Sequence, residues 1–198
     1  MSLPKLLPVI LAAGNSSRLG SPKQLLAFND SDLLSHASAT ITNAVGLAPL
    51  VVLGANFSDI FLKLHKKPDY LTINSRWSEG MSSSIQRALA VATDEVDGLL
   101  LAVCDQPLIS VNHFRAMADG FKRLPEAVHA SVYPSGKPGV PAVVPRRLFA
   151  ALNLLEGDRG AQALLFNDST LVPYNCPEAQ LDIDTEADQQ SLLAHKNV

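Results

Sequence analysis

The chain has 198 residues, a length that fits one domain with a sizeable core. Hydrophobic residues make up 47% of it and charged residues 18%, which is typical of an ordered globular protein. The formal net charge of −3 excludes the basic footprint of a nucleic-acid-binding protein, and no apolar run is long enough to span a membrane. Two cysteines give neither a disulfide framework nor a metal-binding spacing, so we expect a cytoplasmic protein.

Apolar runs alternate with helical patterns along the chain. Strand–helix alternation favours a mostly parallel sheet with helices on both faces, because parallel strands need crossover connections. In such α/β folds, ligands bind beyond the carboxyl ends of the strands. We predict a single domain over residues 1–198, with strands at 9–12, 50–53, 71–73, 99–103, 130–133, 142–144 and 171–173, and helices at 32–45, 58–64, 81–92, 112–124, 146–155, 161–167 and 186–194.

A loop of small polar residues follows the first predicted strand and carries two positive charges, Arg18 and Lys23. Exposed backbone N–H groups, small side chains and fixed positive charges are what a triphosphate needs. The loop is not a Walker A loop, because two residues separate Gly20 from Lys23, and it is not a dinucleotide fingerprint, because Gly14 has no glycine two positions later. It predicts phosphate binding; the alternative is a surface turn with scattered charges.

Two aspartate segments predict a divalent cation site. Asp105 directly follows the most apolar predicted strand, and Mg²⁺ prefers a few carboxylate oxygens together with substrate phosphates. The alternative for Asp105 is a helix N-cap, a role that Ser110 also fits. Near the other end of the sequence, alternation places Asp182 and Asp184 on one face of a strand. One of these two carboxylates, Asp184 in preference to Asp182, completes the cation site; alternatively, Asp184 or Thr185 caps the following helix.

The segment 74–85 follows a predicted strand and opens a helix. Gly80 permits close approach of a ligand, and three serines lie in the first helical turn, so this helix start can hold the base or ribose of a nucleotide. Trp77 is either a lid or a packing anchor. The stretch 134–141, rich in proline and glycine, is expected to be a loop bordering the site, and 157–161 is a second glycine loop that either receives an anion or is an ordinary turn.

These motifs together resemble the molybdenum cofactor cytidylyltransferases, within the MobA-like nucleotidyltransferases. The resemblance rests on segments 11–23, 74–85, 104–107, 157–161 and 182–185. It implies a Rossmann-like α/β fold and Mg²⁺-dependent transfer of a nucleoside monophosphate to a phosphorylated acceptor, with release of pyrophosphate. In the cytidylyl members the substrates are CTP and the molybdopterin cofactor, and a molybdenum hydroxylase is a possible client. Where those members are expected to carry Gly-His-Pro, this chain has Val at the middle position.

The resemblance also implies roles for individual residues. The expected catalytic residues are Arg18, Lys23 and Asp105, and Mg²⁺ is expected on Asp105 and Asp184. The alternatives are guanylyl transfer, another cytidylyl or sugar-phosphate nucleotidyltransferase, and a non-catalytic nucleotide- or cofactor-binding accessory protein for molybdenum hydroxylases. The expected nucleotide-binding residues are Leu11, Ala12, Ala13, Gly14, Ser16, Ser17, Arg18, Lys23, Asn74, Gly80 and Ser84.

Overall fold

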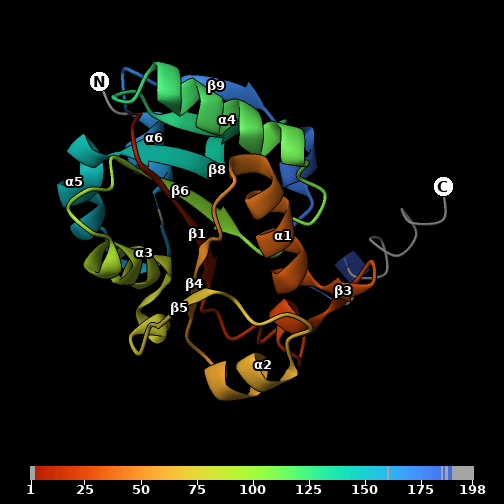
Figure 1. Cartoon of the computed structure of the whole chain (residues 1–198). Coiled ribbons are helices and arrows are strands. Elements are labelled where there is room, and N and C mark those ends of the chain that lie inside the picture. Colours follow the sequence, from red (N-terminus) through yellow and green to blue (C-terminus); the bar gives the residue numbers. More distant parts are fainter. Residues whose placement is uncertain (1–2, 160, 184, 186, 189–198) are drawn as a thin grey trace.

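A seven-stranded sheet forms the centre of the computed structural model, which describes residues 3–159, 161–183, 185 and 187–188 (Figure 1). The strand order is β5–β4–β1–β6–β8–β7–β9. β8 runs antiparallel to both of its neighbours, and the other six strands run in one direction. The strands are β1 (Leu6–Ala12), β4 (Leu50–Leu53), β5 (Tyr70–Ile73), β6 (Gly98–Val103), β7 (His129–Val132), β8 (Pro138–Pro145) and β9 (Val172–Asn175).

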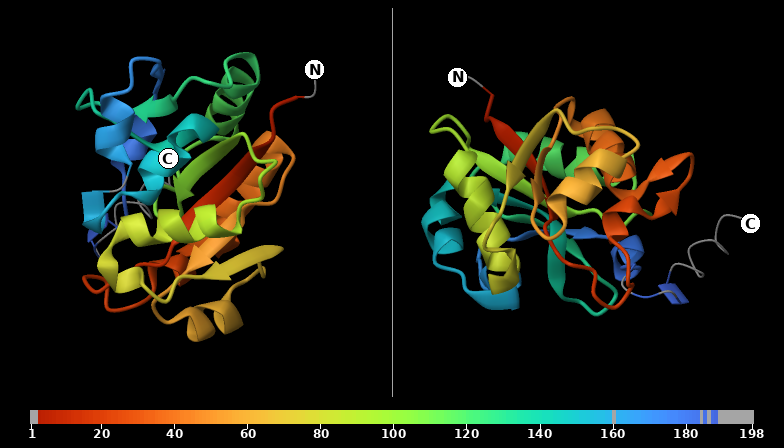
Figure 2. Two further views of the ribbon diagram at one scale, coloured as in Figure 1. Left: turned by 90° about the vertical axis from the view of Figure 1, so that its left-hand side faces the viewer. Right: turned by 90° about the horizontal axis from the view of Figure 1, so that it is seen from below.

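Helices cover both faces of this sheet, with α1 and α4 on one face and α3 and α5 on the other (Figures 1 and 2). Successive residues of a strand point to opposite faces, so Ile10 joins the core under α1 and α4 while Val9 and Leu11 join the core under α3. The protein is therefore an α/β protein of the Rossmann-like type, as predicted. Its helices are α1 (Leu33–Val45), α2 (Phe57–Lys63), α3 (Met81–Val91), α4 (Val111–Arg123), α5 (Phe149–Asn153) and α6 (Gln162–Phe166).

The structure differs from the sequence-based expectation in three places. Residues 138–141 are not part of a loop but belong to β8, because they pair with β7 through Val132 and Ser131. Residues 181–183 form no strand, although Ile183 is fully buried and Asp182 is exposed as the alternation implied. A small hairpin, β2 (Ala27–Phe28) with β3 (Ser31–Asp32), was not expected. Most of the predicted helix 186–194 lies outside the described residues.

His129 is a fully buried polar group in the sheet, beneath α4. Its Nε2 lies 3.1 Å from the Leu124 carbonyl oxygen, and its Nδ1 lies 3.0 Å from the Tyr174 hydroxyl oxygen. A carbonyl oxygen only accepts, so Nε2 carries the proton and Tyr174 donates to Nδ1. The ring is thus held neutral with both of its nitrogens satisfied.

The stability of the protein should fall as the pH drops below about 6.5, the ordinary pKa of histidine. Burial lowers the pKa of His129, so on acidification the unfolded chain takes up a proton at this residue before the folded chain does. The stabilisation is therefore complete above that pH and is lost as the pH falls toward the folded-state pKa. Urea unfolding across this range should show that the free energy of unfolding of His129→Gln depends less on pH than that of the wild-type protein. Parallel curves for the two proteins would contradict the expectation.

Candidate functional site

The end of β6 and the loop after β1 bring two predicted site residues together. Lys23 opens a short 3-10 helix (Lys23–Leu25), and its Nζ lies 2.6 Å from Oδ2 of Asp105, which follows β6. The two side chains are only 16% and 17% exposed, so the ion pair is partly shielded from solvent. Because β1 and β6 are parallel neighbours, both groups lie at the carboxyl edge of the sheet.

The second carboxylate oxygen of Asp105 has features of a cation ligand. Oδ1 is buried and has no hydrogen-bond donor among the described residues. A buried oxygen without a partner is costly unless a ligand meets it, and a single carboxylate oxygen plus phosphate oxygens suits Mg²⁺. No group of three His, Cys, Asp or Glu side chains that could hold a metal occurs in the described part of the chain, so a cation here would also need ligands from a substrate.

The Asp-Ile-Asp segment does reach Asp105. The peptide N–H of Ile183 donates to the carbonyl oxygen of Asp105 at 3.0 Å. Oδ1 of Asp182 accepts from the amide of Gln106 at 2.8 Å, so Asp182 is tied to the residue after Asp105. Asp184, the predicted second metal ligand, lies outside the described residues.

The loop after β1 has its carbonyl oxygens turned into the protein. Those of Ala12 and Gly14 accept from Nε2 of Gln24 at 2.7 and 3.3 Å, and that of Ala13 accepts from the N–H of Ala55 at 3.0 Å. In a trans peptide the N–H points opposite to the C=O, so the N–H groups that follow face away from these partners.

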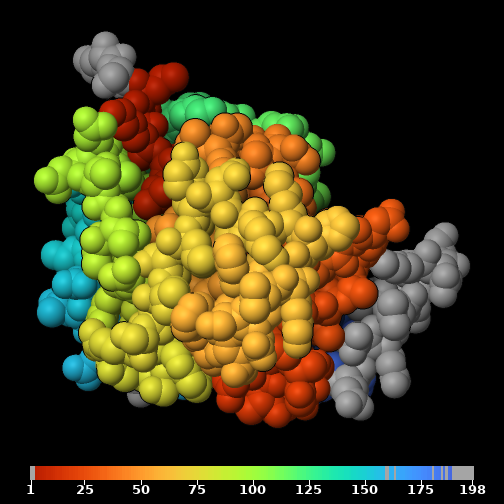
Figure 3. Space-filling model, turned by 60° about the horizontal axis from the view of Figure 1, so that its bottom comes forward, coloured from red at the N-terminus to blue at the C-terminus, as the bar shows by residue number. Residues whose placement is uncertain are grey.

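Four consecutive N–H groups of this loop are available for a ligand. Those of residues 14–17 donate to no acceptor within the described parts of the chain. Ser16 has a φ of 52°, and its side-chain oxygen accepts from the N–H of Lys23 at 3.0 Å, which ties the middle of the loop to the 3-10 helix. Ser17 and Arg18 are exposed. A run of unpaired N–H groups beside positive side chains is suited to phosphate. This loop, in red, reaches the surface on the face shown in Figure 3.

A cavity of about 180 Å³ opens beside the loop. Its walls come from the end of β1, the start of α3 and the 3-10 turn Gly157–Arg159. Trp77 lines it while remaining partly buried, so it packs into the cavity wall as one of the two interpretations expected. Predicted nucleotide-binding residues from two separate segments thus share one space. The lining residues are Leu11, Ala13, Gly14, Trp77, Gly80, Met81, Ser84 and Asp158.

Asn74, also predicted to bind nucleotide, lies behind this cavity and is absent from its described lining. Its Nδ2 donates to the hydroxyl oxygens of Ser83 and Ser84 at 2.8 and 3.0 Å, and its Oδ1 accepts from the N–H of Arg76 at 2.9 Å. The side chain is only 3% exposed. It therefore holds the start of α3 in position, and it lines a neighbouring cavity of about 570 Å³.

Sequence reasoning missed two glutamines that organise the site. Gln24 is 1% exposed and holds the loop after β1 by its hydrogen bonds to the two carbonyl oxygens described above. Gln106 donates to Ala179 and Asp182 and so anchors the segment that follows β9. Each follows a charged site residue directly in the sequence, but that adjacency alone does not indicate which backbone atoms the amide meets. Both amide oxygens are buried without a donor in the part of the chain that the structure describes.

Replacing Gln24 by methionine should weaken triphosphate binding about tenfold, because two hydrogen bonds of roughly 1 kcal/mol each orient the loop. The measurement is the affinity for pyrophosphate, which probes the phosphate loop without the base. Gln86→Met is a matched control, since the Gln86 amide also donates to two carbonyls, those of Asn153 and Leu155, at 3.1 and 2.9 Å. Equal losses of affinity in both variants would contradict a specific role for Gln24.

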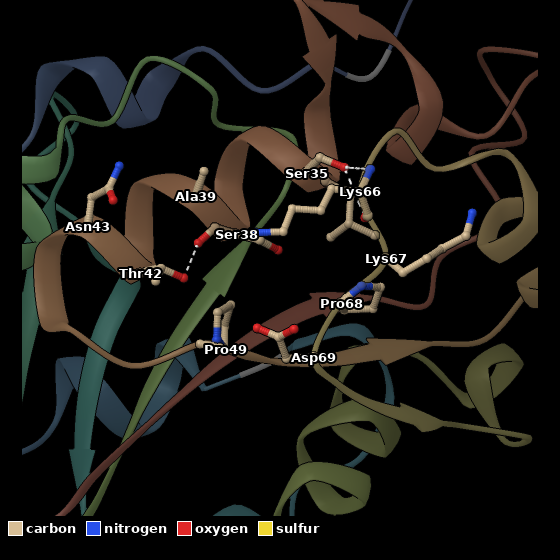
Figure 4. A pocket seen from close by; sticks show the side chains of 12 residues that line it. Ser35, Ser38, Ala39, Thr42, Asn43, Pro49, Lys66, Lys67, Pro68 and Asp69 are labelled. Atoms are coloured by element: carbon tan, nitrogen blue, oxygen red, sulfur yellow. Dashed lines mark hydrogen bonds between the residues drawn. The ribbon is translucent and has the colours of Figure 1, made fainter.

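A separate cavity of about 140 Å³ lies between α1 and the Lys66–Asp69 segment (Figure 4). None of the predicted site residues is among its described lining residues. Thr42 already donates a hydrogen bond to the Ser38 carbonyl oxygen at 2.7 Å within α1. The Ser35 hydroxyl is hydrogen-bonded to the backbone of Lys66. The predicted nucleotide-binding residues that line a cavity therefore lie at the carboxyl edge of the sheet and not here.

No helix among the described residues is long and apolar enough to cross a membrane.

The fold and the geometry of the site are those expected of an α/β nucleotidyltransferase. Residues 8–171 match the family model of the MobA-like NTP transferase domain, and the chain belongs to this family. It is 30% identical over 200 residues to nicotine blue oxidoreductase of Paenarthrobacter nicotinovorans, covering 96% of this chain and 98% of that protein.

Solved structures share this fold. The Rv0371c protein of Mycobacterium tuberculosis H37Rv is 26% identical, with a TM-score of 0.82 over 98% of this chain and 100% of that one. The same protein has been solved in complex with manganese; that structure is 24% identical and has a TM-score of 0.75, with the same coverage. The chain is thus a MobA-like nucleotidyltransferase by sequence and by fold.

Proposed function

We propose that this nucleotidyltransferase transfers CMP from CTP to the phosphate of a molybdopterin cofactor and releases pyrophosphate. The observation that carries the transfer chemistry is the shielded Lys23–Asp105 pair next to the unpaired N–H groups of the loop. The choice of CTP and of molybdopterin rests on the motifs that resemble the cytidylyl members of the family. A molybdenum hydroxylase is the proposed client for the product.

The reaction joins two anions. An acceptor phosphate oxygen attacks the α-phosphorus of the nucleotide, the bond from that phosphorus to the bridging oxygen of the β-phosphate breaks, and pyrophosphate leaves. Catalysis is then mainly positioning and charge neutralisation. In the proposal, Lys23 and Arg18 neutralise the triphosphate, and the N–H groups of residues 14–17 hold the leaving phosphates.

Asp105 would hold Mg²⁺ through Oδ1, which accepts no hydrogen bond from the described residues, and Asp184 is proposed as its second protein ligand. Bound there, the cation would supply neutralisation of phosphate charge. The cavity beside the loop would receive the nucleoside, with Leu11, Gly80 and Ser84 in its walls. The backbone of Ala12 to Gly14, whose carbonyl oxygens are turned into the protein, would form the part of the site next to the phosphates.

A second candidate comes from the relative that matches over nearly its full length. Its name, nicotine blue oxidoreductase, describes redox chemistry on nicotine blue and not nucleotidyl transfer. The corresponding function here would be a redox reaction of nicotine blue or a compound like it. The accessory alternative, binding of a nucleotide or cofactor for a molybdenum hydroxylase, is compatible with the same site.

One assay separates these functions. The purified protein is mixed with molybdopterin cofactor, Mg²⁺ and, in turn, each common nucleoside triphosphate, and pyrophosphate release is followed. Release with CTP alone, abolished by a chelator, is the expected result. Release with GTP would make the protein a guanylyltransferase, and CTP binding without release would favour the accessory role. Reduction of nicotine blue by a reduced nicotinamide, without pyrophosphate release, would favour the second candidate.

A further inference from the structure

One wall of the 180 Å³ cavity carries a charge that the phosphate chemistry does not use. Asp158, in the turn Gly157–Arg159, is the one charged residue among the described residues that line this cavity. Apolar side chains of Leu11, Trp77 and Met81 make up much of the remaining wall. The Asp158 carboxylate makes no hydrogen bond or ion pair with any other residue that the structure describes.

The position of this carboxylate depends on Gly80. A Cβ built on Gly80 would lie 2.6 Å from Oδ1 of Asp158 and 2.5 Å from the carbonyl carbon of Gly157. Only a glycine allows the turn to approach the start of α3 this closely. A carboxylate group offers two acceptor oxygens to a ligand in the cavity.

We propose that Asp158 selects the base of the nucleotide by accepting a hydrogen bond from an exocyclic amino group. This inference rests on the proposed function, in which the cavity receives the nucleoside. Cytosine presents an N4 amino donor, which a carboxylate can accept, whereas uracil has a carbonyl acceptor at the same ring position. Two acceptors facing each other repel, so Asp158 accounts for a preference for CTP over UTP.

CTP and UTP are the informative pair because they differ only along this edge of one ring. Adenine and guanine also carry amino groups, so their exclusion is not assigned to Asp158. The two nucleotides have bases of equal size and the same triphosphate. A difference in their affinities therefore reports on the contact between the base and Asp158.

The test is equilibrium binding of CTP and of UTP without acceptor, which requires no turnover. The wild-type protein should prefer CTP by about tenfold to a hundredfold. Asp158→Asn should lose or reverse this preference, because its amide can donate to the uracil carbonyl. Asp158→Ala should bind both nucleotides without preference. Glu156→Gln, an exposed carboxylate two residues earlier that lines the adjacent cavity, is the matched control and should keep the wild-type ratio.

An unchanged CTP-to-UTP ratio in Asp158→Asn would overturn the inference, and so would a failure of wild-type protein to bind either nucleotide. Thermal unfolding of each variant shows whether it is folded. The proposed function fails by a different readout, the absence of pyrophosphate release with every nucleotide and acceptor. A CTP preference that depends on Asp158 in a protein that releases no pyrophosphate would support this inference alone.

Discussion

Replacing Lys23 by methionine should lower the rate of nucleotidyl transfer by at least about a hundredfold, the usual loss when one stabilising donor is removed from a charged transition state. Nζ of Lys23 is 2.6 Å from Asp105 and stands beside the unpaired N–H groups of the loop. Methionine keeps most of the chain length but supplies no charge. The measurement is kcat for pyrophosphate release, together with urea unfolding. We expect the fold to be retained with a loss of about 1–3 kcal/mol, because Asp105 loses its partner.

Lys122→Met is the control for this variant. Lys122 also forms an ion pair, with Asp119 at 2.9 Å, but that pair lies on α4 and its side chains are about half exposed. Exposed pairs contribute little, so both activity and stability should be close to wild type. Near-normal turnover of Lys23→Met would refute the assigned role of Lys23. Asp105→Asn should also be inactive, since it removes the charge while keeping the side-chain shape.

Gly80→Ala should destabilise the protein by about 2–4 kcal/mol, from backbone strain and steric overlap together. Gly80 has a φ of 98° and a ψ of −178°, a conformation that is essentially restricted to glycine. An added Cβ would lie 2.5 Å from the carbonyl carbon of Gly157 and 2.7 Å from its oxygen, so backbone would have to move. The cavity wall would move with it, and nucleotide affinity should fall as well. Urea unfolding and nucleotide binding measure the two effects.

Gly136→Ala separates strain from overlap. Gly136 has a φ of 77°, but a Cβ there meets no atom within 4 Å. We expect a loss of about 1–2 kcal/mol from the left-handed backbone alone, with nucleotide affinity unchanged. Equal destabilisation of the two variants would show that the close approach of Gly157 to Gly80 contributes nothing.

The fold was largely predictable because its signals are local. The seven strands expected from apolar runs exist, since continuous apolar runs such as 99–103 have few alternatives to burial between two layers of helices, whereas the strand expected around Asp182 does not form. The ends of the strands were less predictable where pairing with another strand determines them. Residues 138–141 carry prolines and a glycine that indicate a loop, yet pairing with β7 extends β8 through them.

The charged residues of the site could be predicted from the sequence, but the residues that hold its backbone in position could not. Lys23 and Asp105 could be placed at the same edge of the sheet, because both follow strands expected to be parallel, but their ion pair appears only in the structure. Gln24 could not, because its role depends on where two carbonyl oxygens point once the loop has formed. Asn74 has a side chain suited to binding a nucleotide, but its amide donates hydrogen bonds to two serines of α3. Residue type and spacing in the sequence do not reveal those contacts.

The position of β1 has a consequence for how the protein is made. This strand is synthesised before β4 and β6, yet it lies between them in the sheet, and its pairing with β6 needs residues 98–103. Until those residues emerge, an apolar strand keeps an open edge that can join another chain. Pairing over such a separation is also slow. The yield of folded protein should therefore depend on growth temperature and on chaperones that shield nascent chains.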